Sequence, residues 1–236
     1  MYLDTVFTSP LNRAFLTMII ETFVLTAFQQ NTRIVACENM RKAICIDPGE
    51  ASPEVVEFVK TNGLELSAIC LTHGHLDHIG GTRFMKDNFP DAEILLHRDE
   101  EPLYNALKQQ PLAMGIPPHQ LAAMGFDYDD PPPPTRFVAH GEIVEIGDLK
   151  FEIRHCPGHT LGHIVLVEEN ERVVFTGDCL FSGTIGRTDL PGGNHEQLIS
   201  SIVANVLSLD DDFTAYCGHG SETTIGRERM TNPFLT

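Results

Sequence analysis

Residues 72–81 read T-H-G-H-L-D-H-I-G-G and directly follow a continuous apolar run that is typical of a buried strand. His73 and His75 are two residues apart, so their side chains point the same way on an extended strand end. Asp77 and His78 come after the chain turns and can present a second cluster. Imidazole and carboxylate groups are ligands of zinc and similar metals, so this pattern predicts a metal site rather than a polar loop with incidental histidines.

Three further ligand candidates each follow a predicted strand and stand beside a glycine: His159, Asp178 and His219. One such residue alone is usually a cap or turn residue, because polar residues prefer turns. Three of them, in a chain that also carries the first motif, favour one metal centre built from several strand ends.

The elements that must position these residues can be read from hydrophobic periodicity and turn residues. Helices are expected at about 52–63, 81–88 and 196–207, and a stiff surface loop at the four prolines 131–134. Strands are expected at 19–28, 33–37, 43–46, 66–71, 94–97, 143–146, 151–155, 164–167, 173–176 and 214–217. Each half of the chain has strands first and a helix after, which predicts an α+β protein with an αββα four-layer sandwich. We expect residues 1–17 to form an N-terminal extension and residues 18–236 one domain.

Composition narrows the class of partner. Sixteen Lys and Arg face 33 Asp and Glu, and a net charge of −17 repels nucleic-acid phosphates. The six cysteines are scattered without a C-x-x-C pair, which favours reduced thiols and a cytoplasmic protein. The apolar stretch 14–28 is interrupted by Glu21 and is too short to span a bilayer. We therefore expect no nucleic-acid or membrane partner, and the sequence leaves the oligomeric state open.

The order H-x-H-x-D-H, glycine-flanked His, Gly-Asp and Gly-His resembles the metallo-β-lactamase superfamily. Within it, the segments C-P-G-H-T at 156–160, G-R-T-D at 186–189 and N-P-F-L at 232–235 are similar to the glyoxalase II (hydroxyacylglutathione hydrolase) group, especially its shorter bacterial type. The resemblance covers roughly residues 18–236. It is specific for the superfamily and much less specific for the substrate.

This resemblance implies two divalent metal ions per chain, with zinc expected first and iron or manganese as alternatives. By the same resemblance, the first ion is held by three histidines, His73, His75 and His159. The second ion is held by Asp77, His78 and His219. Asp178 bridges the two ions. Asp77 also takes the catalytic role, and Arg187 stands where the family has a basic substrate-binding residue. Two such ions supply a hydroxide near neutral pH, so no Ser or Cys nucleophile is needed.

The leading functional hypothesis is hydrolysis of a small-molecule thioester, S-D-lactoylglutathione, to D-lactate and glutathione, as in methylglyoxal detoxification. Glutathione recognition stays open, because tyrosines of the larger glyoxalase II enzymes are replaced by Asp189 and Ser221 and only seventeen residues follow His219. Alternatives are an iron-dependent persulfide dioxygenase, a lactonase, β-lactamase or phosphodiesterase of the same fold, and a metal-buffering protein.

Several tempting residues are predicted to lie outside the metal centre. Cys179 and Cys217 should pack in the core because of the two-residue alternation of strands. His195 is expected at the start of a helix. The remaining histidines considered have no partner pattern: His97, His140, His155 and His163.

Overall fold

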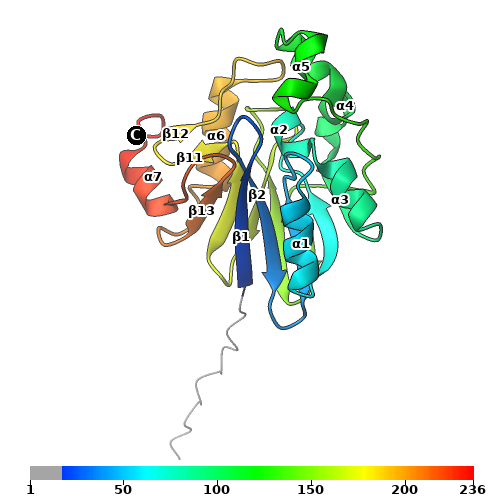
Figure 1. Cartoon of the computed structure of the whole chain (residues 1–236). Helices are drawn as coiled ribbons and strands as arrows, with labels where there is room; N and C mark the ends of the chain where they lie inside the picture. The colour runs from blue at the N-terminus through cyan, green and yellow to red at the C-terminus, as the bar shows by residue number, and fades with distance from the viewer. Residues whose placement is uncertain (1–17) are drawn as a thin grey trace, which may run out of the picture.

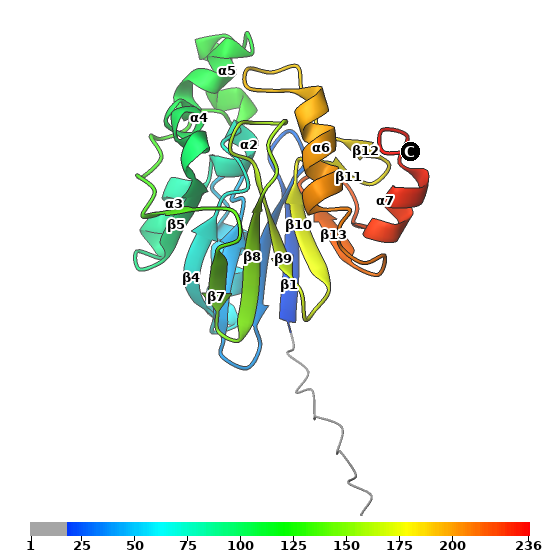
Figure 2. The ribbon, with the colours of Figure 1, turned by 180° about the vertical axis from the view of Figure 1, so that it is seen from behind.

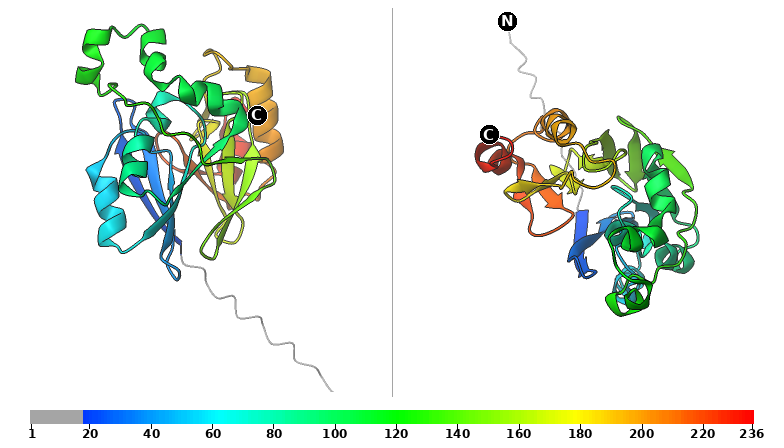
Figure 3. Two further views of the ribbon diagram at one scale, coloured as in Figure 1. Left: turned by 90° about the vertical axis from the view of Figure 1, so that its right-hand side faces the viewer. Right: turned by 90° about the horizontal axis from the view of Figure 1, so that it is seen from above.

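Two six-stranded β-sheets lie face to face and carry helices on their outer faces, as the side view in Figure 3 shows. This computed structural model describes residues 18–236, so the predicted extension 1–17 lies outside the described residues. The layers follow the order helix, sheet, sheet, helix, and the predicted α+β αββα sandwich is confirmed.

The first sheet follows chain order, antiparallel through its first three strands and parallel from the third to the sixth. Its strands are β1 (Met18–Leu25), β2 (Gln30–Cys37), β3 (Lys42–Ile46), β4 (Glu65–Cys70), β5 (Glu93–His97) and β6 (Arg136–Val138). Parallel neighbours require crossover connections, and helices supply them here. These helices are α1 (Pro53–Thr61), α2 (Leu76–Ile79) and α3 (Thr82–Asn88).

The second sheet has the order β14-β13-β10-β9-β8-β7, and β10 pairs with β13 in parallel (Figure 2). Its strands are β7 (Ile143–Ile146), β8 (Leu149–His155), β9 (Ile164–Glu168), β10 (Val173–Gly177), β13 (Thr214–Cys217) and β14 (Thr223–Thr224). The remaining elements of this half are a small ribbon and two helices: β11 (Leu180–Phe181), β12 (Thr184–Ile185), α6 (His195–Asn205) and α7 (Ile225–Thr231).

Strand alternation divides the buried side chains among three apolar layers. In β2, Ile34 and Ala36 enter the layer beneath the first helices, whereas Val35 and Cys37 enter the layer between the sheets. A third layer fills the space between the second sheet and α6. Apolar packing therefore holds both sheets in fixed register, and their strand ends can position side chains accurately.

The chain between β5 and β6 forms short helices at one end of the sandwich, near α2 in Figure 1. They are η1 (Arg98–Glu100), α4 (Glu101–Asn105), η2 (Leu107–Gln109), α5 (Gln110–Ala113), η3 (Pro118–Gln120) and η4 (Ala122–Met124). The four prolines after them lie in a loop, as predicted.

The first hairpin turns earlier than predicted. We expected the first strand to run through residue 28 and the second to begin at residue 33, but β1 ends at Leu25 and β2 begins at Gln30. Thr26 and Gln29 adopt positive φ angles of 63° and 57°, which make the turn. The short elements β6, β11, β12, β14 and α7 were not predicted, because two to seven residues carry little periodic signal.

Candidate metal centre

The seven predicted ligands come together at one end of the sandwich, although four different segments of the chain supply them. His73 and His75 follow β4, whereas Asp77 and His78 belong to the short helix α2. His159 lies between β8 and β9. Asp178 follows β10, and His219 follows the parallel strand β13.

The first cluster consists of three imidazoles. His159 Nε2 lies 3.2 Å from His73 Nε2 and 2.9 Å from His75 Nδ1. His73 and His159 are buried and His75 is half-buried, so the three nitrogens meet in a largely enclosed space.

The second cluster contains Asp77, His78 and His219. His219 Nε2 lies 3.3 Å from both His78 Nε2 and Asp77 Oδ2, and the last two atoms are 3.9 Å apart. His78 is fully buried, whereas the other two side chains are half-buried.

Asp178 lies between the clusters and contacts both. Its Oδ1 is 3.3 Å from His78 Nε2, and its Oδ2 is 3.5 Å from His219 Nε2 and 3.8 Å from His159 Nε2. Although buried, Oδ1 has no hydrogen-bond donor among the described residues. A buried carboxylate oxygen without a donor is costly, and a cation at this position would satisfy it.

Asp47 orients the rings of His73 and His78 by hydrogen bonds to their outer nitrogens, directly for His78 and through Thr72 for His73. His78 Nδ1 donates to Asp47 Oδ2 at 2.9 Å. The Thr72 hydroxyl donates to the same oxygen at 2.6 Å, so its own oxygen accepts from His73 Nδ1 at 3.0 Å. Each ring thus has its Nδ1 occupied and directs Nε2, the nitrogen that would bind a metal, into the centre.

Backbone carbonyls do the same for His159 and His219. His159 Nδ1 donates to the carbonyl of Arg187 at 2.8 Å, and His219 Nδ1 donates to that of Phe28 at 3.0 Å. Outer hydrogen bonds of this kind orient metal-binding imidazoles and increase their basicity. The protein itself thus directs four Nε2 atoms into the centre.

The donor set fits divalent metal ions. At zinc–nitrogen bond lengths of 2.0–2.1 Å and tetrahedral angles, two ligand nitrogens lie about 3.3 Å apart. The measured nitrogen–nitrogen distances are 2.9, 3.2 and 3.3 Å. Facing lone pairs at this spacing repel each other unless a cation lies between them.

The first cluster holds neutral ligands. Burial lowers the pKa of His75 to about 3, with His159 contributing. Burial likewise lowers the pKa of His159, and it holds the pKa of His73 well below the ordinary value. An unprotonated imidazole is the form that binds metals.

The second cluster is electrostatically different because two carboxylates face it. Burial opposes a positive charge on His78, but Asp178 and Asp77 raise its pKa well above the ordinary value. The same carboxylates overcome burial and raise the pKa of His219 to about 10. This field favours positive charge, so the second cluster is suited to a cation.

Sequence patterns missed residues that support the ligands from behind. Asp47, which directly follows β3, is buried and also accepts from the Thr72 N–H at 2.7 Å. His163 Nε2 accepts from the Asp178 backbone at 3.0 Å, and a Cβ on Gly177 would lie 2.8 Å from that nitrogen. No spacing pattern in the sequence marks these contacts, because each joins different strands.

Asn31 fixes the loop that carries His219. Its side-chain amide donates to the carbonyls of Cys217 and Gly220 at 3.0 and 2.9 Å, and its backbone N–H donates to Gly218 at 2.8 Å. The early turn of the first hairpin thus places β2 directly against a metal-ligand loop.

The side chain of Arg187 lies outside both clusters. Its guanidinium pairs with Asp189 through contacts of 2.8 and 2.9 Å, and both side chains are exposed. The hydrogen bond from Arg187 lowers the pKa of Asp189 to about 2. Arg187, the predicted substrate-binding residue, therefore contacts the centre only through its backbone carbonyl, which bonds to His159. Its charged side chain is paired with Asp189.

A separate group of possible ligands, His97, Asp99 and His155, lies at the ends of β5 and β8. The two rings are stacked with centroids 4.3 Å apart and an angle of 11° between planes. A metal in the plane of one ring would lie well out of the plane of the other, so we interpret this group as a packing contact. The absence of a partner predicted for these histidines was wrong, since they partner each other.

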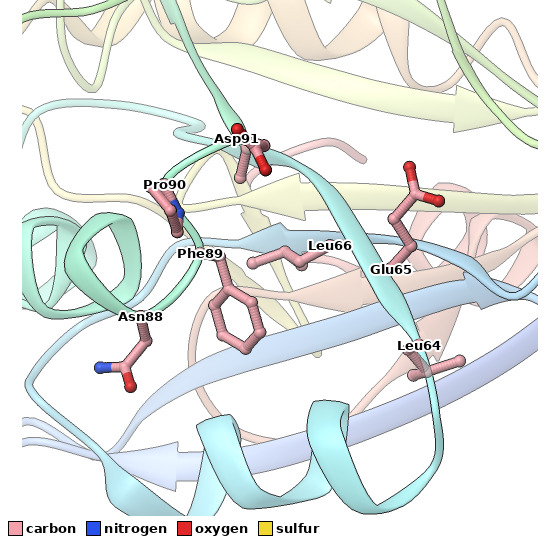
Figure 4. A pocket seen from close by; sticks show the side chains of 8 residues that line it. Leu64, Glu65, Leu66, Asn88, Phe89, Pro90 and Asp91 are labelled. Carbon is pink, nitrogen blue, oxygen red and sulfur yellow. The ribbon is translucent and has the colours of Figure 1, made fainter.

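Other sequence predictions hold. Cys179 is buried in the layer beneath α6, Cys217 is also buried, and His195 is the first residue of that helix. A shallow groove contains Phe89 and Leu66 near the amino ends of β4 and β5 (Figure 4), so it lies at the opposite ends of these strands from the histidines.

Comparison with known proteins identifies the family. Residues 25–219 match the family model of the Metallo-beta-lactamase superfamily. The chain is 41% identical over 219 residues to hydroxyacylglutathione hydrolase GloC of Haemophilus influenzae, covering 92% of this chain and 98% of the relative.

Two solved structures are similar throughout. The BLEG-1 B3 metallo-β-lactamase has a TM-score of 0.79 and 32% identity, covering 92% of this chain and 100% of that structure. TTHA1623 in a di-iron-bound form has a TM-score of 0.78 and 33% identity, with coverages of 91% and 100%.

The fold and the His/Asp clusters define a metallo-hydrolase. The chain belongs to the metallo-β-lactamase superfamily and has the metallo-β-lactamase fold. Within residues 18–236, no helix combines the length and apolar character that crossing a bilayer requires.

Proposed function

We propose that this chain hydrolyses a small-molecule thioester, S-D-lactoylglutathione, at a centre of two divalent metal ions. The observation that carries the proposal is the Asp178 carboxylate, which lies within 4 Å of histidines from both clusters and has a buried oxygen that accepts no hydrogen bond within residues 18–236. The similarity to a hydroxyacylglutathione hydrolase supports the choice of substrate.

The ligands divide as the clusters do. The first ion would be held by His73, His75 and His159. The second would be held by Asp77, His78 and His219. Asp178 would supply a carboxylate to both ions. When bound, the two ions supply an activated water at neutral pH and polarise the thioester carbonyl. We propose zinc, and iron is the alternative, since the similar TTHA1623 is di-iron-bound.

The reaction consumes one water, forms a C–O bond and breaks the C–S bond, which releases a carboxylate, a thiol and one proton. Asp77 is the proposed catalytic residue. Within the described residues, the Asp77 carboxylate contacts histidines only through Oδ2. Its Oδ1 is therefore available to accept a proton from water. The half-buried position of Asp77 lets this proton pass to solvent.

The direct test combines elemental analysis with a thioester assay. Purified protein is expected to carry close to two metal ions per chain and to release glutathione from S-D-lactoylglutathione, with loss of turnover after chelation and recovery after zinc or iron is added. Metal-loaded protein that leaves this thioester intact would contradict the proposed substrate. A reproducible content of one ion, even in excess metal, would contradict the two-metal centre.

Substrate charge provides a second prediction. Because Asp189 already neutralises Arg187, an anionic thioester must displace that carboxylate, and exposed ion pairs such as this one are weak. Asp189→Asn is therefore expected to lower KM for S-D-lactoylglutathione about two- to fivefold with little change in kcat. Arg187→Gln should raise KM, and Asp91→Asn, the same charge change beside the groove in Figure 4, should leave it unchanged. An equal KM for Asp189→Asn and the unmodified protein would contradict the role of Arg187 in substrate binding.

A further inference from the structure

The short helices between β5 and β6 send two buried polar side chains to the strand end that carries the metal ligands. Glu100, in η1, is 1% exposed. Its Oε2 accepts from the Gly74 N–H at 2.7 Å, and its Oε1 accepts from the Gly162 N–H at 2.6 Å. One carboxylate thus links the loop after β4 to the loop before β9.

Gln110, the first residue of α5, uses both ends of its amide. Its Nε2 donates to the carbonyls of Gly74 and Leu103 at 2.8 and 3.0 Å, and its Oε1 accepts from the Leu76 N–H at 2.9 Å. Gly74 and Leu76 are the neighbours of His75. The main chain is therefore held on both sides of this histidine.

The fit around Gly74 leaves little freedom. A Cβ at this position would lie 3.0 Å from Glu100 Oε2 and 3.1 Å from the Tyr104 nitrogen. The peptide is therefore enclosed by η1 and α4, and its polar groups are bonded to Glu100 and Gln110.

His75 differs from the other four histidines of the centre in the hydrogen bonding of its outer nitrogen. Each of the others has an outer nitrogen bonded to a protein acceptor. His75 faces the cluster through Nδ1, and within residues 18–236 its Nε2 makes no hydrogen bond to protein. Its ring direction must therefore be set by its main chain.

We propose that Gln110 and Glu100 are positioning residues that fix His75 for metal binding. The inference rests on the proposed metal centre and extends it to a segment that supplies no ligand. The helical segment between β5 and β6 then serves the centre directly instead of only covering the sheet.

The test is the nearly isosteric substitution Gln110→Glu. It keeps the acceptor for Leu76 but replaces the donating NH2 group with an oxygen that faces the Gly74 and Leu103 carbonyls. Gln109→Glu is the matched control, because it makes the same change of charge at an exposed neighbour. Glu100→Gln is a second variant, since its amide would direct a donor at a backbone N–H.

Zinc affinity is measured by competition with a chelator of known affinity, and melting temperature is measured with and without zinc. Gln110→Glu and Glu100→Gln are expected to weaken binding of one zinc per chain about 10- to 100-fold and to reduce the rise in melting temperature that zinc produces. Gln109→Glu should match the unmodified protein in both measurements.

Unchanged zinc affinity in both buried variants would overturn the inference. An equal drop in melting temperature with and without zinc would also overturn it, because a purely structural role predicts that result. If the unmodified protein itself binds no zinc or iron, the proposed metal centre fails instead, so the two failures are distinguishable.

Discussion

Asp178→Ala is expected to empty both metal clusters and to reduce kcat/KM by at least about 10³-fold, equivalent to about 4 kcal/mol. The carboxylate lies within 4 Å of histidines from both clusters, so its removal takes a ligand from each proposed ion. It also removes the negative charge that screens the repulsion between two cations at close range. Elemental analysis of the purified variant and thioester kinetics measure the two effects.

The variant His219→Ala, which removes a ligand of one proposed ion only, is the comparison for Asp178→Ala. An imidazole nitrogen binds one ion, and the only proposed ligands that His219 contacts are Asp178 and members of the second cluster. We therefore expect this variant to retain about one ion per chain. Asp91→Ala, beside the groove in Figure 4, controls for loss of an exposed carboxylate. Two retained ions and near-normal turnover in Asp178→Ala would mean that Asp178 is only a turn residue.

The ligands themselves could be predicted because their signal is local. His73, His75, Asp77 and His78 fall within one short segment after an apolar strand, where two-residue alternation fixes directions. The other ligands stand beside glycines at strand ends, where the chain must turn. Their convergence then follows from stacking two sheets whose cores are apolar.

The supporting residues could not be predicted, because their partners are distant in the sequence. Asn31 bonds to the carbonyl of Cys217, 186 residues away, and this depends on where the first hairpin turns. Gln110 lies in a segment without periodicity, and its contacts depend on how that segment folds back over α2. Hydrogen bonds of this type are fixed by tertiary register, which hydrophobic patterns do not encode.

Asp47→Asn is expected to have the second large effect, even though Asp47 is not a proposed ligand. Its carboxylate accepts hydrogen bonds from the Thr72 N–H, the Thr72 hydroxyl and His78 Nδ1. It also lies close enough to His73 and His78 to resemble a ligand, but its oxygens are already occupied by these donors. An amide of the same shape presents two N–H donors and cannot accept all three bonds.

We expect Asp47→Asn to weaken metal binding about 10- to 100-fold. His78 would lose its acceptor, and the Thr72 hydroxyl that accepts from His73 would lose its own. A buried donor left without an acceptor should also lower the free energy of unfolding by about 1–3 kcal/mol. Chelator competition and denaturant unfolding of the metal-free protein measure the two effects separately. If Asp47→Asn binds metal as tightly as the unmodified protein, water or another group must orient His73 and His78, and the support assigned to Asp47 is wrong.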